Sequence, residues 1–285
     1  FIFSLIFFTL LFYPPFWLNP MLFFTAVNHM SNYFNDVCTH TLGSCMHPKN
    51  LPSTYIPIWL SVKLPLFIIL GIILLPFTEK KIFVDKRKNI FFGTLLITSI
   101  LLPLILILKK VHLYDELRQV MFLIPLLFLI GSISLYFLSK KFFYVVGILT
   151  ACLFIIENIK INPYQYVWFN LPSRYLDLTN KFELEYQGIS GREIASKISK
   201  FENNDLCVLA NPMHTVKPYL VNSNFNCFDI WQKIDTDYKR PFLAVQHVRN
   251  LKKGKSYKCN SIHEDGFKLL FHKNKIITGK LLKCE

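Results

Sequence analysis

Five long apolar runs follow one another in the first 158 residues of the chain, and the remaining 127 residues contain none of similar length. The runs occupy residues 1–18, 55–77, 90–108, 120–138 and 142–156. Each approaches the ~20 residues with which a helix crosses about 30 Å of hydrocarbon. Because they are continuously apolar and do not alternate every second residue, they predict about five transmembrane helices and no membrane barrel. The alternative is a soluble helical core, whose buried helices are also apolar all round.

The pattern predicts two domains, a membrane all-α domain at 1–158 with a large loop at 20–54, and a small α/β domain at 159–285. Within the loop, residues 21–34 carry apolar side chains at helical spacing, which predicts an amphipathic helix at the membrane interface. Residues 39–55 are rich in Gly, Pro and small polar side chains and predict irregular backbone. Such backbone either lines a cavity or forms an ordinary surface loop.

The last 127 residues show short elements instead of long runs. The aromatic segment 162–170 suits the headgroup zone, just beyond a spanning helix. The spacing of Ile194, Ile198 and Phe201 predicts a helix over 191–201. Short apolar or alternating runs predict strands at 206–210, 242–247, 267–272 and 276–282.

Basic residues orient the predicted helices. The connection 78–89 holds five Lys or Arg, and Lys140 and Lys141 follow the fourth run. Short basic loops stay in the cytoplasm, so the loops 20–54 and 109–119 and everything after residue 158 are predicted to be extracytoplasmic. The chain begins with Phe1 inside an apolar run, without the charged start of a signal peptide, so we expect further residues upstream.

The cysteines fit this orientation. Cys152 lies inside an apolar run and is predicted to pack there. The other six fall on the predicted outside, where disulfides form: Cys38, Cys45, Cys207, Cys227, Cys259 and Cys284. The four in the tail allow three connectivities, of which the nearest pairs, Cys207 with Cys227 and Cys259 with Cys284, are favoured. No zinc spacing appears, so we expect no metal site, and the sequence indicates neither a cofactor nor a divalent cation.

The net charge of +14 divides unevenly: residues 1–158 carry +6, and the tail, with 20 Lys or Arg and 12 Asp or Glu, carries +8. A basic domain outside the cytoplasm attracts anionic membrane lipids or phosphate-bearing substrates. Nucleic acid is a poor partner, because the basic residues are scattered. Walker, GxGxxG and GxSxG motifs are absent from the sequence, so no nucleotide site or serine nucleophile is proposed.

Five segments in order resemble the C-terminal part of bacterial GT-C integral-membrane glycosyltransferases, relatives of dolichyl-phosphate-mannose protein mannosyltransferases. They read PPFWLNP at 14–20, LPSTYIPIW at 51–59 with Lys63, LYDELR at 113–118, NPYQYVWFN at 162–170 and FELEYQGIS at 182–190. The family pattern would place an aromatic pair at Ser53 and Thr54, Gly at Glu116, His at Gln119, and Asp then Trp at Glu185 and Gln187.

The resemblance implies an inverting enzyme of the bacterial inner membrane with its C-terminal domain in the periplasm. It would move a sugar from a polyprenyl-phosphate donor to a glycan, lipid or protein acceptor. In this family the catalytic carboxylate lies in the first outer loop, which we expect upstream of Phe1.

The loop 109–118 is the predicted site for the donor phosphate. A lipid-phosphate leaving group needs cations at headgroup depth. Arg118 offers a planar fork, and the side chains of Lys109, Lys110 and His112 supplement it, with Tyr114 beside them. Asp115 would orient Arg118 or contact a sugar hydroxyl. Without the resemblance, the same basic residues anchor helix ends at headgroups, and Asp115 with Arg118 is a surface pair.

His47 and Tyr55 on the large loop are predicted substrate contacts. Two other functions compete with the enzyme, namely a membrane anchor for an extracytoplasmic binding domain and a transporter of lipid-linked sugar. Ionisable residues in mid-helix would favour transport. Lys63 is the only charged residue inside a run, and Glu157 directly follows one, so neither lies at a run centre.

Overall fold

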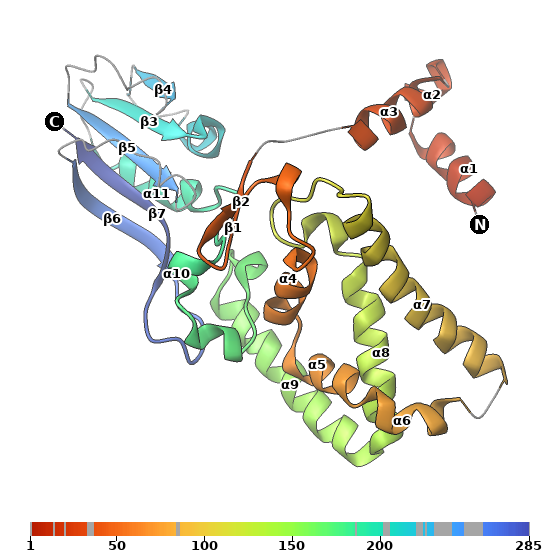
Figure 1. The fold of residues 1–285 in the computed structure, drawn as a ribbon. Coiled ribbons are helices and arrows are strands. Elements are labelled where there is room, and N and C mark those ends of the chain that lie inside the picture. The colour runs from red at the N-terminus through yellow and green to blue at the C-terminus, as the bar shows by residue number, and fades with distance from the viewer. Residues whose placement is uncertain are drawn as a thin grey trace. The chain divides into compact units, whose positions relative to one another are not determined.

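The computed structural model describes residues 2–13, 15–19, 21–32, 37–83, 86–185, 187–201, 206–220, 225, 227–230, 241–247 and 259–284. The chain forms two compact units, Phe1–Val37 and Cys38–Glu285. Figure 1 shows the first as a short helical segment and the second as a group of helices and a sheet.

The first unit contains α1 (Ile2–Phe12), α2 (Pro15–Leu18) and α3 (Met21–Asn32). The prediction of a spanning helix over residues 1–18 is wrong, because the 11 residues of α1 rise only about 16 Å. A proline disfavours helical backbone in the residue before it, which is Tyr13. Helix α3 confirms the helix predicted after Met21.

Six helices build the first part of the second unit: α4 (Tyr55–Lys63), α5 (Leu66–Ile73), α6 (Leu75–Ile82), α7 (Lys86–Leu108), α8 (Leu123–Leu138) and α9 (Lys140–Lys160). Among the described residues, two helical segments are long and apolar enough to cross a membrane, Asn89–Leu108 and Lys140–Lys160. The pair α4 and α5 is a third if its 120° bend interrupts one span. The predicted number of about five is therefore wrong, and the structure supports two or three.

The bend between α4 and α5 follows from Pro65. Its ring disfavours helical backbone in the preceding residue, and Leu64 is extended, with ψ 139°. Beyond the bend, α5 packs closely on α8. A methyl group on Gly71 would lie 2.1 Å from the carbonyl oxygen of Gly131, so only glycine fits at this contact.

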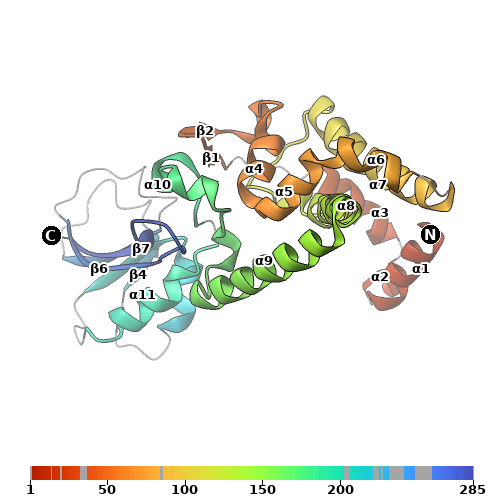
Figure 2. The same ribbon diagram turned by 90° about the horizontal axis from the view of Figure 1, so that it is seen from below.

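The bent pair leads from one end of the helical group to the other. At the start of α4, the Tyr55 hydroxyl reaches the loop that follows α7. In α6, the Thr78 hydroxyl lies 3.0 Å from that of Ser134, and Lys81 donates to the carbonyl of Phe137, near the end of α8. Figure 2 shows α9 running from α8 to the sheet.

The α/β domain confirms the small α/β fold predicted for the tail. Its strands are β3 (Cys207–Asn211), β4 (Phe228–Ile230), β5 (Phe242–His247), β6 (Cys259–Phe267) and β7 (Ile276–Cys284), in the order β4-β3-β5-β7-β6. Strand β3 is parallel to β4 and β5, and β7 is antiparallel to β5 and β6. Helix α11 (Ser190–Ile198) packs apolar side chains, including those of Ile194 and Ile198, against β3 and β5.

Three predicted features of the second unit need correction. The predicted strand 267–272 is wrong, since β6 ends at Phe267 and a turn follows. Residues 39–55 are not wholly irregular, because they contain the hairpin of β1 (Thr39–Thr41) and β2 (Ser44–Met46) and a 3-10 turn at Pro48–Asn50. The aromatic segment after α9 is not confined to a surface, since Tyr164 and Phe169 are buried in the core.

The disulfides confirm both favoured pairings, Cys207–Cys227 and Cys259–Cys284. A third disulfide, Cys38–Cys45, brackets the β1–β2 hairpin. Cys152 is exposed on α9, so its predicted packing role is wrong. Its thiol faces the surroundings of a helix apolar enough to lie in lipid.

Candidate functional site

The loop between α7 and α8 presents a cluster of basic side chains. The side chains of Lys109, Lys110, His112 and Arg118 are all exposed. Arg118 opens a short 3-10 turn, Arg118–Val120, and its side chain is 58% exposed. The loop thus gathers its cations at the end of a helix that is long and apolar enough to cross a membrane.

The backbone of this loop is strained at its acidic pair. Asp115 and Glu116 have φ values of 55° and 64°, in the left-handed region that favours glycine. Such conformations cost roughly 1–3 kcal/mol each and persist only where surrounding contacts hold them. The Asp115 N–H donates to the Thr39 hydroxyl at 2.9 Å, which ties the loop to the β1–β2 hairpin.

Asp115 is placed to orient Arg118. Its carboxylate lies 3.5 Å from the Arg118 guanidinium, and only 8% of its side chain is exposed. Because Asp115 is buried and Arg118 is open, the pair holds the guanidinium without covering it. Tyr114 is half-buried, and its N–H donates to the side chain of Gln119 at 2.9 Å.

A buried ion pair lies behind the exposed cations. Lys63 at the end of α4 lies 2.7 Å from Glu116, and both side chains are at most 10% exposed. The Lys63 ammonium also donates to the carbonyl of Tyr166 and lies 4.2 Å from the centre of the Phe169 ring. The other Glu116 oxygen, Oε1, has no hydrogen-bond partner among the described residues.

The environment of Glu116 favours its neutral form. Burial raises the pKa of its carboxyl to about 7, and the negative charges of Glu183 and Asp115 add to this effect. The nearby Lys63 ammonium opposes the rise. The pKa of Glu116 thus lies close to neutral pH, and the residue is buried within the loop whose basic side chains are exposed.

Sequence reasoning missed the pair of Lys63 and Glu116, although one signal was present. A lysine inside an apolar run is costly to bury unless it meets an opposite charge. Glu116 is one of only two acidic residues in the loop 109–119, so it was an available partner.

Tyr55 is not a substrate contact. Its side chain is 1% exposed, and its hydroxyl donates to the Glu116 carbonyl at 3.2 Å. Its hydrogen bond holds the strained backbone of the loop at Glu116. The sequence could not predict this role, because it shows only that Tyr55 begins an apolar run.

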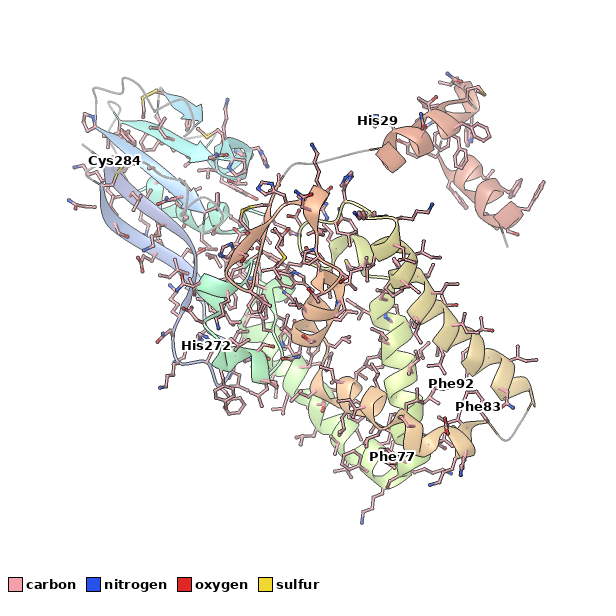
Figure 3. The ribbon with its side chains drawn as sticks, viewed as in Figure 1. His29, Phe77, Phe83, Phe92, His272 and Cys284 are labelled. Atoms are coloured by element: carbon pink, nitrogen blue, oxygen red, sulfur yellow. A yellow bond between two sulfur atoms is a disulfide. The ribbon has the colours of Figure 1, made fainter. Side chains whose placement is uncertain are left out.

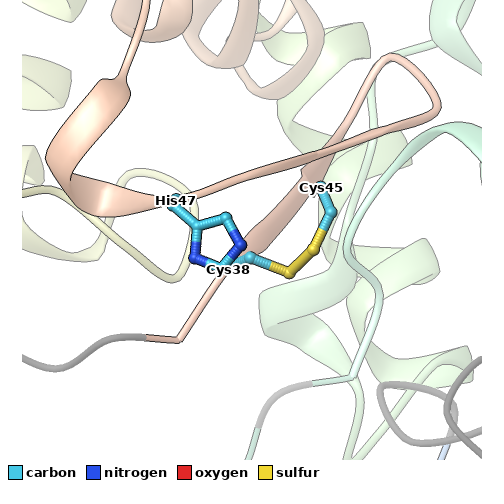
Figure 4. A group of neighbouring side chains, drawn as sticks. All are labelled: Cys38, Cys45 and His47. Carbon is cyan, nitrogen blue, oxygen red and sulfur yellow. A yellow bond between two sulfur atoms is a disulfide. The ribbon is translucent and has the colours of Figure 1, made fainter.

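His47 is exposed and lies beside the Cys38–Cys45 disulfide, as Figure 4 shows. These three residues form the single group within the described part of the chain that has metal-ligand geometry. The two sulfurs are bonded to each other, and metals bind cysteine as thiolate. The oxidised protein therefore does not offer a metal site at this group.

A second buried ion pair was also missed. Arg174 donates to Glu157 at the end of α9, with a 2.6 Å contact, and to the carbonyls of Phe169 and Leu270. Trp168 donates its indole N–H to the same carboxylate at 2.8 Å. The pair fixes the α/β domain to the last turn of α9.

Ser190, His247 and Glu185 have the residue types of a hydrolase triad, but they lie in the interior. The Ser190 hydroxyl is 2.8 Å from His247 Nδ1 and donates to Glu185, and Thr215 lies 2.9 Å from the other ring nitrogen. Burial opposes ionisation of Glu185, but hydrogen bonds from His247 and Tyr166 hold the pKa of its carboxyl below the usual value. Ser190 is fully buried and out of reach of a substrate, so this cluster is not an active site. Its hydrogen bonds link α11 to β5.

The basic loop therefore remains the candidate site, with Asp115, Glu116 and Lys63 as its support. A comparison of the chain with protein-family models, with curated proteins and with solved structures finds no match.

Proposed function

We propose that the chain belongs to a membrane glycosyltransferase that moves a sugar from a polyprenyl-phosphate donor to a glycan, lipid or protein acceptor. One observation carries the proposal, namely the exposed cluster of Lys109, Lys110, His112 and Arg118 at the end of the membrane-compatible helix α7. The cluster would lie where the phosphate of a lipid-linked donor lies.

The chemistry of the cluster suits such a donor. When a sugar leaves a lipid phosphate, negative charge develops on the phosphate, and fixed cations stabilise it. The Arg118 guanidinium offers paired donors to phosphate oxygens, and Asp115 restricts its orientation. The two lysines add positive potential around it, and the His112 ring offers a further hydrogen-bonding nitrogen.

The proposal places the basic loop and the α/β domain on the extracytoplasmic face of a bacterial inner membrane. Leu113 and Leu117 of the loop share one core cluster with Ile161 and Tyr164, which follow α9, so both parts lie at one end of the helices. Lys140 and Lys141 lie at the other end of α9. Short basic connections stay in the cytoplasm, which supports this orientation.

The substitution Arg118→Ala tests the proposal. Transfer from a radiolabelled polyprenyl-phosphate sugar by the full-length protein should fall by ~10- to 100-fold at equal expression, because a charge-assisted contact to the leaving group is lost. Arg192→Ala is the matched control, since Arg192 is exposed on α11 and should be neutral.

Equal transfer by the Arg118→Ala and wild-type proteins would remove Arg118 from the donor site. If the wild-type protein transfers no sugar from any polyprenyl-phosphate donor, the proposed reaction itself is wrong.

A further inference from the structure

A groove of about 170 Å³ opens beside the last turns of α9. Its walls are mainly apolar and come from four parts of the second unit: the start of α5, α9, the segment 168–174 and the loop between β6 and β7. They include Phe67, Leu153, Phe154, Leu171, Leu270 and Phe271. The groove is smaller than the ~300 Å³ at which small-molecule pockets begin, so it fits a segment of a chain and not a whole substrate.

Four of the five polar side chains at the groove, all except Thr150, form hydrogen bonds within the protein. Glu157 and Arg174 bind each other, and the Trp168 indole donates to Glu157. The Asn170 amide donates to the carbonyls of Ser61 and Leu64. These four groups are therefore already paired, and the groove selects an apolar ligand.

The groove lies on a helix that is long and apolar enough to cross a bilayer. Leu153 and Phe154 are 44% and 41% exposed in the second half of that helix, Lys140–Lys160. Because these two lining side chains are exposed, the groove would face the hydrocarbon chains of the leaflet next to the Lys160 end.

The β6–β7 loop extends this apolar surface toward the headgroups. Phe271 is 66% exposed and has φ 62°, a left-handed conformation that is unusual for a bulky residue. The neighbouring Leu270 is held at both backbone groups, since its N–H donates to Glu157 and its carbonyl accepts from Arg174. These bonds fix the strained residue beside the end of α9.

The charges around Phe271 suit an anionic surface. Lys268, Lys273 and Lys275 are exposed within four residues of it. Figure 3 places His272 at the end of the sheet next to the helices, and Cys284 at the opposite end. The loop thus combines an exposed aromatic ring with cations, as membrane-surface segments do.

We propose that the groove binds an acyl chain of a bilayer phospholipid, with Phe271 inserted beside that chain and the loop lysines near its phosphate. The site would seat the α/β domain on the membrane surface. This inference rests on the membrane location in the proposed function, and it does not depend on sugar transfer.

The test places tryptophan at three positions of the full chain, reconstituted in vesicles of phosphatidylcholine with brominated acyl chains. Fluorescence of the Phe271→Trp protein should be quenched at least twofold more than that of Lys283→Trp, at the opposite end of the sheet. Ile148→Trp, exposed on α9 away from the groove lining, is the control for membrane insertion.

Quenching of Ile148→Trp without quenching of Phe271→Trp would overturn the lipid contact while leaving the membrane location intact. If the fluorescence of neither the Ile148→Trp nor the Phe271→Trp protein is quenched, both the membrane location and the lipid site are wrong. Loss of sugar transfer alone would contradict only the proposed reaction.

A second variant tests the groove separately from the loop. Thr150 lines the groove, and Thr150→Trp should fill it and reduce phospholipid that stays bound in native mass spectrometry by at least twofold. Ile148→Trp, on the same helix, should retain it. Equal retention by both variants, or an isoprenoid lipid in place of phospholipid in the wild type, would overturn the site.

Discussion

At the scale of single residues, the buried pair of Lys63 and Glu116 dominates the candidate site. Burying either charge without the other would cost several kcal/mol of desolvation free energy. The ion pair also joins α4 to the loop that follows α7. Asp115 and Arg118 form the exposed counterpart, in which one partner remains open.

We expect Lys63→Met to lower the free energy of unfolding at pH 8 by about 3–5 kcal/mol, because it leaves the ionised Glu116 carboxylate buried without its positive partner. The double variant Lys63→Met with Glu116→Gln should recover most of that loss. Chemical denaturation of the wild type, both single variants and the double variant measures the interaction energy of the pair as a double-mutant cycle. Arg192→Met, at an exposed position, is the control. Strictly additive losses would show that the two side chains do not interact.

The pH dependence of stability follows from Glu116. Its pKa is raised to about 7 in the folded protein, so the folded state keeps a proton that the unfolded chain releases near its ordinary value of 4.5. This contribution is complete below about pH 4.5 and is lost as the pH rises through about 7. Lys63 and Tyr55 from α4, Asp115 from the same loop, and Glu183 are the groups that influence this titration.

Thermal unfolding between pH 5 and pH 8 should therefore show a falling midpoint for the wild type. The Lys63→Met, Glu116→Gln double variant should show a weaker slope over the same range. Parallel slopes for the two proteins would assign the pH dependence to other groups.

At the scale of helices, the contact between α5 and α8 depends on two glycines. A methyl group on Gly71 meets the Gly131 carbonyl at 2.1 Å, and one on Gly131 meets the Ile68 carbonyl at 2.6 Å. Because both obstacles are backbone, neither can move aside without separating the helices.

Gly71→Ala and Gly131→Ala should each lower the thermal midpoint by several degrees through this separation. Gly93→Ala in α7 is the control, since a methyl group there has no neighbour within 4 Å, and alanine favours helix by up to about 1 kcal/mol. Equal midpoints for all three variants would contradict the close helix packing.

Sequence patterns predicted some elements and missed others for identifiable reasons. The helix over 191–201 and the strand over 242–247 were confirmed because their apolar positions face one buried core. Strand β6 was missed because it lies at the sheet edge, where its polar side chains stay exposed, and because irregular pairing at Gly266 breaks the alternation. The bend within run 55–77 was missed because Pro65, which causes it, is apolar and does not interrupt the hydrophobic pattern.

The candidate site was only partly predictable in the same way. Arg118 and the two lysines could be identified as basic residues next to an apolar run. The left-handed backbone of Asp115 and Glu116 could not be predicted, because neither residue is glycine. The support from Thr39 depends on a hairpin more than 70 residues away along the chain.

At the scale of the whole second unit, one core joins the basic loop to the start of the α/β domain. In a Cys152→Ser background, Lys110→Cys and Lys268→Cys should therefore react with a membrane-impermeant maleimide from the same side. Lys140→Cys, at the other end of α9, should react only from the opposite side. Labelling of intact spheroplasts and inverted vesicles measures this, and opposite accessibility of Lys110→Cys and Lys268→Cys would contradict the shared face.

The proposed orientation puts the basic loop and Lys140 on opposite faces, so α8, which is shorter than the two candidate spans, would also have to cross the bilayer. The 16 residues of α8 rise about 24 Å, whereas a typical hydrocarbon core is about 30 Å thick. Exposed Phe128 and Leu129 would meet lipid along this helix. A membrane adapts to such hydrophobic mismatch by local thinning. Around α8 the two polar interfaces would approach each other, and lipid headgroups there would lie deeper than in the surrounding bilayer.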